Sequence, residues 1–241
     1  MSRLQIIHTA DLHGTLTQDM ARRLRDLREQ HDAVLLDSGD AISAGNVTFR
    51  RGPEPVLLQM NAAGYAAMAL GNREYFFRRR FLLHKTAPAG FPLVCANLRA
   101  KQGDLRPILP SVVLDTPAGR LGVFGLMPTM IVPATVAEWF SDMVFVEWPI
   151  AAREVVTRLA RETDLVVALS HRGWGDDQLL AQQEPELALI LGGHEHAWES
   201  DFRYAGHVPA SYVGARGTHA ALIGLDPEHP HEATRELIPL Q

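Results

Sequence analysis

Short apolar segments recur along the chain, and each is followed at once by glycine or polar residues. They are rich in Val, Ile and Leu and do not alternate strictly with polar positions, which is typical of strands buried on both faces. The five clearest segments are Leu4–Ile7, Ala33–Leu36, Ala66–Leu70, Leu165–Leu169 and Leu187–Leu191.

Segments with helical spacing lie between these strands. Pro53 and Asp176 stand at expected helix starts, where proline and aspartate are favoured. Alternating strands and helices predict an α/β fold with a mostly parallel sheet and helices outside it. The expected helices are Leu16–Gln30, Pro53–Ala63, Ile150–Glu162 and Asp176–Gln183.

Two pairs of segments have the pattern of hairpins. Ile108–Asp115 and Arg120–Met127 flank a turn that contains Gly119, and Val208–Val213 and His219–Leu225 flank the turn at 214–217. Apolar segments joined by a short glycine turn favour antiparallel pairing. We therefore expect antiparallel strands at the borders of the parallel sheet.

The chain shows no linker, low-complexity run or internal repeat, so we expect one domain over residues 1–241. Three prolines follow Asp226, at 227, 230 and 239. This composition predicts a surface tail over 227–241.

Composition excludes several classes of protein. Hydrophobic residues make up 46% and charged residues 21% of the 241, as in an ordinary globular protein. The net charge of −5 argues against a general nucleic-acid binder, which normally has a basic surplus. No segment reaches the roughly 18 apolar residues of a membrane helix, and the N-terminal apolar segment is too short for a signal peptide. The expectation is a soluble, cytoplasmic protein that binds no membrane.

The single cysteine, Cys95, excludes an intrachain disulfide. Its apolar flanks predict a thiol packed in a buried strand and not a nucleophile.

The residues that close the predicted strands carry the chemistry. Ligands of open α/β sheets bind beyond the carboxyl ends of the strands, and five strands here deliver oxygen or nitrogen donors to that edge. Single donors of this kind are usually caps or turn residues, but the joint pattern indicates a metal site. The seven donors are Asp11, His13, Asp40, Asn72, His171, His194 and His196.

The types of donor narrow the choice of metal. Without thiolates a structural zinc site is excluded, and imidazole, carboxylate and amide donors suit Mn²⁺, Fe²⁺ or Zn²⁺. Seven donors exceed the needs of one catalytic ion. Two divalent ions about 3.5–4 Å apart that share one carboxylate account for the number.

The donors stand in the segments Asp11-Leu12-His13, Gly39-Asp40, Gly71-Asn72, Ser170-His171 and Gly193-His194-Glu195-His196. In this order the chain resembles the calcineurin-like metallophosphoesterases, and in particular their 5′-nucleotidase branch. The resemblance runs from about Leu4 to Leu225. It implies a sandwich of two mixed β-sheets flanked by α-helices.

The resemblance also implies roles for individual residues. Asp40 would bridge both ions together with a hydroxide that attacks phosphorus. The implied activity is hydrolysis of small phosphomonoesters or phosphodiesters, with nucleotides among the candidates, and the partner would be a small phosphorylated substrate. We favour Mn²⁺, with Fe²⁺ or Zn²⁺ as alternatives. The first ion would be held by Asp11, His13 and His196 and the second by Asn72, His171 and His194.

Arg73 departs from the family pattern, which has a histidine after the Gly-Asn pair. Arginine cannot donate a proton at useful pH, but its planar fork binds phosphate oxygens. The expected catalytic residues are Asp40, Asn72 and Arg73. If Arg73 points to solvent or pairs with Glu74, it has no such role.

The alternative function is a catalytically weak protein that binds metal and phosphate on the same fold. A third candidate, a DNA repair nuclease, is disfavoured by the acidic charge.

Other residues near the motifs are weaker candidates. Asn72, Arg73 and Arg172 are the expected substrate contacts, although Arg172 could equally pack. Arg216 in the 214–217 turn is a further possible contact, and His8 could support the metal ligands from behind. The run at 78–80 is either a solvated helix face or an attractor of anions.

Secreted 5′-nucleotidases carry a C-terminal domain that binds the base, and the chain ends about where it would begin, so the resemblance does not imply nucleotide specificity.

Overall fold

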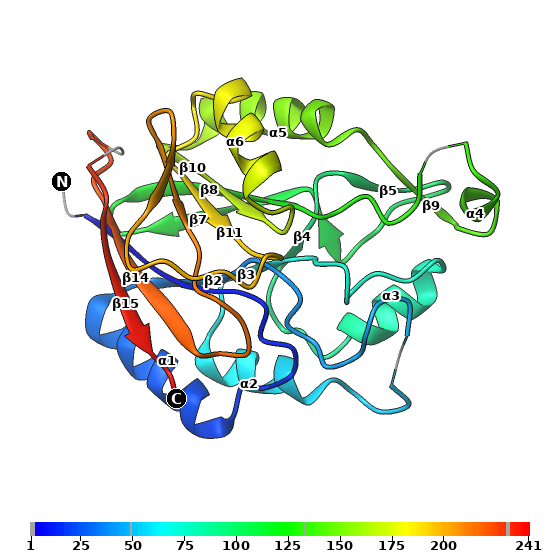
Figure 1. The fold of residues 1–241 in the computed structure, drawn as a ribbon, viewed down its shortest axis with the longest axis horizontal. Coiled ribbons are helices and arrows are strands. Elements are labelled where there is room, and N and C mark those ends of the chain that lie inside the picture. Colours follow the sequence, from blue (N-terminus) through cyan, green and yellow to red (C-terminus); the bar gives the residue numbers. More distant parts are fainter. Residues whose placement is uncertain (1–2, 49, 133, 230–231) are drawn as a thin grey trace.

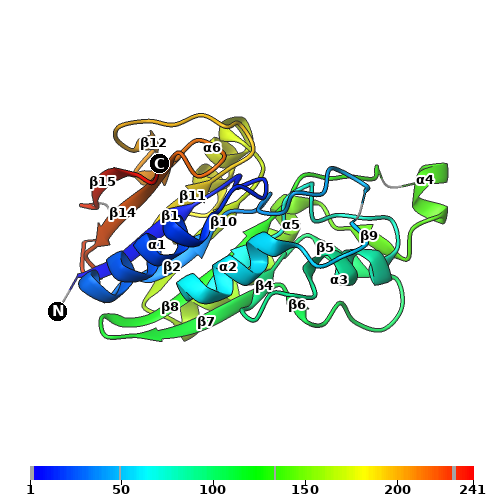
Figure 2. The ribbon, with the colours of Figure 1, turned by 90° about the horizontal axis from the view of Figure 1, so that it is seen from below.

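The computed structural model describes residues 3–48, 50–132, 134–229 and 232–241. Two mixed β-sheets lie face to face, with helices covering the outer face of each (Figures 1 and 2). In Figure 1, α1 and α2 lie below the sheets, and α5 and α6 lie above them. The sandwich expected from the family resemblance is confirmed.

The first sheet has seven strands, in which β1, β2, β3, β4 and β6 are parallel neighbours. β14 pairs antiparallel with β1, and β15 pairs antiparallel with β14. In spatial order the strands are β15 (Thr234–Pro239), β14 (His219–Leu225), β1 (Leu4–Thr9), β2 (Val34–Asp37), β3 (Ala67–Ala69), β4 (Leu93–Val94) and β6 (Ile108–Leu109).

The second sheet has six strands with a parallel centre and an antiparallel strand at each border. In spatial order they are β12 (Arg203–Ala205), β13 (Val208–Ser211), β11 (Leu189–Gly192), β10 (Leu165–Ser170), β8 (Gly119–Leu126) and β7 (Ser111–Thr116). A separate pair is formed by β5 (Leu98–Ala100) and β9 (Met143–Phe145).

The helices begin and end close to the expected positions. Thr17 caps α1 by accepting the backbone N–H of Met20 at 3.2 Å, and Asp32 ends it in a left-handed conformation. The helices are α1 (Gln18–His31), α2 (Pro55–Ala63), α3 (Arg79–Thr86), α4 (Val136–Trp139), α5 (Trp148–Glu162) and α6 (Trp174–Gln183).

Successive residues of one strand belong to different core layers. Leu35 packs in the cluster under α1 and α2, whereas Leu36 packs between the two sheets. A third cluster lies beneath α5 and α6. Because side chains alternate across a strand and both faces of the central strands are covered, β10 is buried at each of its six positions.

Two expectations about the strands are wrong. The segment expected to form one strand from Ile108 is divided at Pro110, which has no N–H to donate, so β6 joins the first sheet and β7 the second. The second expected hairpin does not form, because β13 and β14 belong to different sheets and the 214–217 turn crosses between them. Within the expected surface tail, Thr234–Pro239 form β15, which extends the first sheet as an edge strand.

The other expected hairpin, β7 and β8, is confirmed, with Thr116 opposite Gly119. Cys95 is buried as expected, and its burial raises the pKa of the thiol to about 12. Within the part of the chain that the structure describes, no helix combines the length and the apolar character needed to cross a bilayer.

Candidate metal centre

The seven donors follow strands of both sheets. Asp11, Asp40 and Asn72 lie in the loops after β1, β2 and β3, whereas His171 and His194 follow β10 and β11. Two groups of possible ligand atoms, each within 4.8 Å of one another, come together at this edge. They consist of Asp11, His13 and His196, and of Asp11, Asp40 and His171.

The distances show how closely nitrogen and carboxylate oxygen converge. Asp11 Oδ1 lies 3.5 Å from His13 Nε2, 3.8 Å from His171 Nε2 and 3.4 Å from His196 Nε2. Asp40 Oδ2 lies 3.7 Å from His13 Nε2 and 3.5 Å from His171 Nε2. Four of these five side chains are buried; His196 is about half exposed.

The hydrogen bonding of these side chains fits a cation. In the described residues, eight buried side-chain N and O atoms lack a hydrogen-bond partner. Five of them belong to the donors: Asp11 Oδ1, His13 Nδ1, His13 Nε2, Asn72 Oδ1 and His171 Nε2. Leaving buried polar atoms without a partner is costly, and bound divalent ions would supply the partner that each of these four side chains lacks.

Electrostatics point the same way. Burial alone would raise the pKa of Asp40, but the neighbouring His13 and His171 hold it well below its usual range. Burial lowers the pKa of His171, yet Asp40 and Asp11 outweigh it and raise that pKa to about 9. The carboxylates therefore make this edge a place of negative potential.

Backbone strain is concentrated at the donors. Nine described residues other than glycine have positive φ, and five of them are Asp11, His13, Asp40, His194 and His196. Such conformations are unfavourable for residues with a Cβ and cluster at functional sites. The strained backbone conformation of these loops thus sets the direction of the donor side chains.

A hydrogen-bond chain behind His171 orients its ring. His171 Nδ1 donates to the carbonyl oxygen of Ser38 at 2.9 Å, which leaves Nε2 free toward the carboxylates. The Ser38 hydroxyl bonds to Leu191 O at 2.8 Å and to His8 Nε2 at 2.8 Å. Burial lowers the pKa of His8 to about 3, so its ring is neutral. His8 is thus linked to His171 through Ser38 and does not bond to it directly.

Glu74 fastens two of the loops together, a role that its position in the sequence does not signal. Its buried carboxylate accepts the backbone N–H of Asp40 at 3.0 Å, Gly71 at 2.7 Å and Ile42 at 3.3 Å. Gly71 has to be glycine, because a Cβ there would lie 2.2 Å from Asp40 Oδ1. The loops after β2 and β3 are therefore in direct contact.

Arg73 lies at the centre and does not pair with Glu74. Its backbone N–H donates to Asp40 Oδ1 at 2.7 Å, and its Nε lies 3.7 Å from Asp40 Oδ2. Asn72 Nδ2 donates to Asp40 Oδ2 at 3.1 Å and to Asn46 Oδ1 at 2.8 Å, leaving Asn72 Oδ1 available. Both residues thus border the Asp40 carboxylate.

Of the six histidine and aspartate donors, His194 alone belongs to neither group. Its backbone N–H donates to Asp11 Oδ2 at 2.9 Å, and its ring centroid lies 5.1 Å from that of His171. Burial lowers the pKa of His194. The ring lies adjacent to the second group.

Arg172 has partners of its own. Its guanidinium donates to Met127 O at 2.8 Å, pairs with Asp176 at 2.6 Å and stacks over Trp148. These contacts favour the packing role over a substrate contact.

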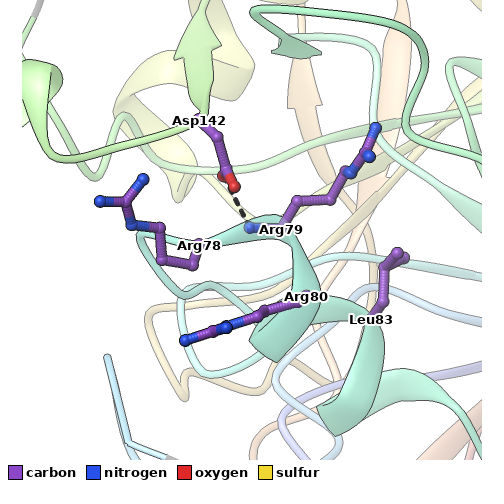
Figure 3. A pocket seen from close by; sticks show the side chains of 5 residues that line it. All are labelled: Arg78, Arg79, Arg80, Leu83 and Asp142. Atoms are coloured by element: carbon purple, nitrogen blue, oxygen red, sulfur yellow. Dashed lines mark hydrogen bonds between the residues drawn. The ribbon is translucent and has the colours of Figure 1, made fainter.

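The arginine run lies around a different cavity. Figure 3 shows Arg78, Arg79 and Arg80 spread around a cavity of about 440 Å³, with Arg79 pointing away from the other two. Asp142 accepts the backbone N–H of Arg79 at 2.7 Å. None of the seven donors lines this cavity, which favours a surface role for the run.

Comparisons with known proteins agree with this geometry. The profile of the calcineurin-like phosphoesterases matches residues 4–198. Snake venom 5′-nucleotidase of Gloydius brevicauda is 31% identical over 92% of this chain and 41% of its own length. The protein UshA of Yersinia enterocolitica is 28% identical over 79% of this chain and 40% of its own. The chain thus spans about two fifths of the length of these relatives.

Solved structures share the fold. A 5′-nucleotidase precursor from Thermus thermophilus superposes with a TM-score of 0.80 at 22% identity, over 98% of this chain and 54% of that one. The calcineurin-like phosphoesterase YfkN from Bacillus subtilis gives 0.79 at 19% identity, over 99% of this chain and 91% of that one.

Proposed function

Because the chain belongs to the calcineurin-like phosphoesterase family, we propose that it is a metal-dependent phosphoric ester hydrolase acting on small phosphate esters. The observation that carries this proposal is the group of unpartnered, buried donor atoms around Asp11 and Asp40. The names of the curated relatives support the same class of reaction.

We propose two ions, with Asp40 as the shared ligand. Asp11, His13 and His196 would hold the first, and Asn72, His171 and His194 the second. Asp11 belongs to both groups of ligand atoms, whereas Asp40 Oδ2 approaches His13 and His171 about equally. Asp11 Oδ1 lies at similar distances, 3.5 and 3.8 Å, from the same two nitrogens, so the distances support a carboxylate between the two ions, and the family resemblance selects Asp40. Nitrogen and oxygen donors without thiolate favour Mn²⁺, with Fe²⁺ or Zn²⁺ as alternatives.

Bound divalent ions would neutralise phosphate oxygens and lower the pKa of an attacking water. The chain's own residues orient the ester. Arg73 carries a guanidinium beside Asp40, where it can bind a phosphate oxygen through its planar fork. Asn72 and Arg73 are thus the proposed substrate contacts, and Asp40, Asn72 and Arg73 the catalytic set.

The substrates we propose are small phosphomonoesters or phosphodiesters, including nucleotides. The nucleotide class is supported by relatives named 5′-nucleotidases, which this chain matches over about 41% of their length. A cytoplasmic location, and the lack of membrane or general nucleic-acid binding, stay predictions from composition.

One measurement tests the proposal. The protein is freed of metal with chelator, reloaded with Mn²⁺, Fe²⁺ or Zn²⁺, and assayed on p-nitrophenyl phosphate and bis-p-nitrophenyl phosphate. Metal-dependent turnover is expected. Metal binding without turnover would instead support the alternative, a metal- and phosphate-binding protein in which Arg73 has replaced the usual histidine.

A further inference from the structure

Arg216 shares the backbone strain of the metal donors although it is not one of them. Its φ is +60°, in the left-handed region. The conformation is fixed from both sides: the Arg216 N–H donates to Asp11 O at 2.7 Å, and its carbonyl accepts from Gln241 Nε2 at 3.0 Å. Arg216 is therefore attached directly to the backbone of a proposed ligand.

The same turn uses glycine at its other left-handed positions. Gly214 and Gly217 have φ of +80° and +66°, and a Cβ on Gly217 would lie 2.3 Å from Met20 Cε. Position 216 would also accept glycine most easily, yet it carries the longest cationic side chain. The arginine side chain therefore stands on a backbone conformation that favours glycine.

The guanidinium of Arg216 is exposed and has no partner among the residues that the structure describes. Arg172 and Arg235, also near this edge, are by contrast bound to backbone carbonyls. Arg73 lies on the Asn72 side of Asp40, whereas Arg216 begins beside Asp11. Two arginines thus border the centre from different sides.

Trp198 stands next to this turn. It follows His196 by two residues, and the adjacent Ala197 O accepts the N–H of Gly214 at 2.8 Å. Trp198 is 54% exposed, and its ring packs against that of His219, with centroids 5.2 Å apart and planes tilted by 30°. A half-exposed, supported indole is a good surface for a flat aromatic group.

We propose that Arg216 and Trp198 form a leaving-group subsite beside the ligands of the first ion. Trp198 stacks on an aromatic group of the ester, and Arg216 binds a second negative charge. Among sugar phosphates, the preferred substrates are then nucleotides with a second phosphate group. This inference rests on the proposed function, since it specifies the substrate of the same site.

The test uses three esters that separate the two contacts. Ribose 5-phosphate has neither feature, adenosine 5′-monophosphate has the base, and adenosine 3′,5′-bisphosphate has both. Arg216→Gly should raise KM for the bisphosphate about tenfold relative to the monophosphate, as expected for a lost charged hydrogen bond. Trp198→Ala should raise KM for both adenine compounds about fivefold or more and leave ribose 5-phosphate unchanged.

Arg216→Gly also separates a functional from a structural role. Glycine fits φ +60°, so the melting temperature should stay equal or rise while affinity for the bisphosphate falls. Arg216→Lys should restore part of that affinity. Arg78→Gly and Trp139→Ala are matched controls, because both side chains lie away from the centre and Trp139 is 83% exposed.

Calorimetry with adenosine 3′,5′-bisphosphate on chelator-treated protein measures affinity at the subsite without turnover. Arg216→Gly and Trp198→Ala should both bind the bisphosphate more weakly than the wild type. If the wild type hydrolyses p-nitrophenyl phosphate but neither variant changes KM or binding for any ester, the subsite is wrong and the proposed function stands. If the wild type hydrolyses nothing under any metal, the proposed function fails, and calorimetry alone decides the subsite.

Discussion

The carboxylate of Glu74 accepts the backbone N–H of Asp40 at 3.0 Å, so a residue that faces no substrate sets the position of the proposed bridging ligand. The same carboxylate holds Gly71 and Ile42. Two loops of the candidate metal centre therefore depend on one buried side chain.

Glu74→Gln should weaken both folding and metal binding. A glutamine can accept from only one of its two terminal atoms, so at least one buried N–H loses its partner, at a cost of about 1–3 kcal/mol in the free energy of unfolding. Urea unfolding in chelator measures the first effect and Mn²⁺ titration the second. Glu54→Gln is the control: Glu54 similarly holds the N–H groups of Ser43 and Ala44 but does not touch Asp40. It should lose stability with little change in metal affinity.

Two metal ions are expected per chain, bridged by Asp40. Asp40→Asn should weaken both ions, whereas His13→Ala should weaken mainly one. Elemental analysis of protein purified without chelator and then loaded with Mn²⁺ gives the number. A wild type that retains one ion or none would contradict the two-ion proposal.

Arg73 should make the enzyme sensitive to the leaving group. General acid catalysis contributes about 10²–10⁴-fold, and arginine cannot supply that proton. We expect good turnover of phenolic esters and weak turnover of alkyl esters, with Arg73→His raising the alkyl rate relative to the p-nitrophenyl rate. Arg73→Ala should raise KM for both classes. Unchanged kcat/KM in Arg73→Ala would place the side chain outside the reaction.

Cys95 should not take part in turnover. Burial raises the pKa of its thiol to about 12, so the thiolate is not populated near neutral pH. Cys95→Ala should keep kcat, and hydrolysis in ¹⁸O-labelled water should place the label in the phosphate product. A trapped phosphorylated enzyme would overturn direct attack by water.

Asp177 should make the protein less stable as pH rises. It is buried, accepts hydrogen bonds from Ser170 and Tyr212, and has Asp176 and Arg172 as charged neighbours. Burial raises its pKa to about 7, above the ordinary value near 3.9. Between these values the folded state holds a proton that the unfolded state has lost, so stability declines from about pH 4 to pH 7 and stays lower above it.

Asp177→Asn removes this titration. Between pH 4 and pH 8 the free energy of unfolding should therefore fall by less in Asp177→Asn than in the wild type. Urea unfolding at the two pH values measures the difference. Asp176→Asn, a neighbour that is partly exposed and paired with Arg172, is the control. An equal pH dependence in wild type and Asp177→Asn would refute the assignment.

The sequence predicts the donors better than the connections between strands. Asp11, Asp40 and His171 are recognisable because each closely follows an apolar strand, a local pattern. Whether Val208 and His219 begin strands of the same sheet depends on distant partner strands, β11 and β1, which no local pattern encodes. The role of Glu74 cannot be predicted for the same reason, since its carboxylate accepts backbone N–H groups that lie 32 and 34 residues away in the chain.

The supply of ligands from both sheets has a mechanical consequence. Asp11 and His196 lie far apart in the chain, and a cation held between them would act as a reversible cross-link that closes a very long loop. Removing the ions should therefore loosen the molecule first along the edge where the two sheets meet, leaving the far end of the sandwich intact. The metal content would then govern how readily this edge opens to proteases and to hydrogen exchange, apart from any part it plays in chemistry.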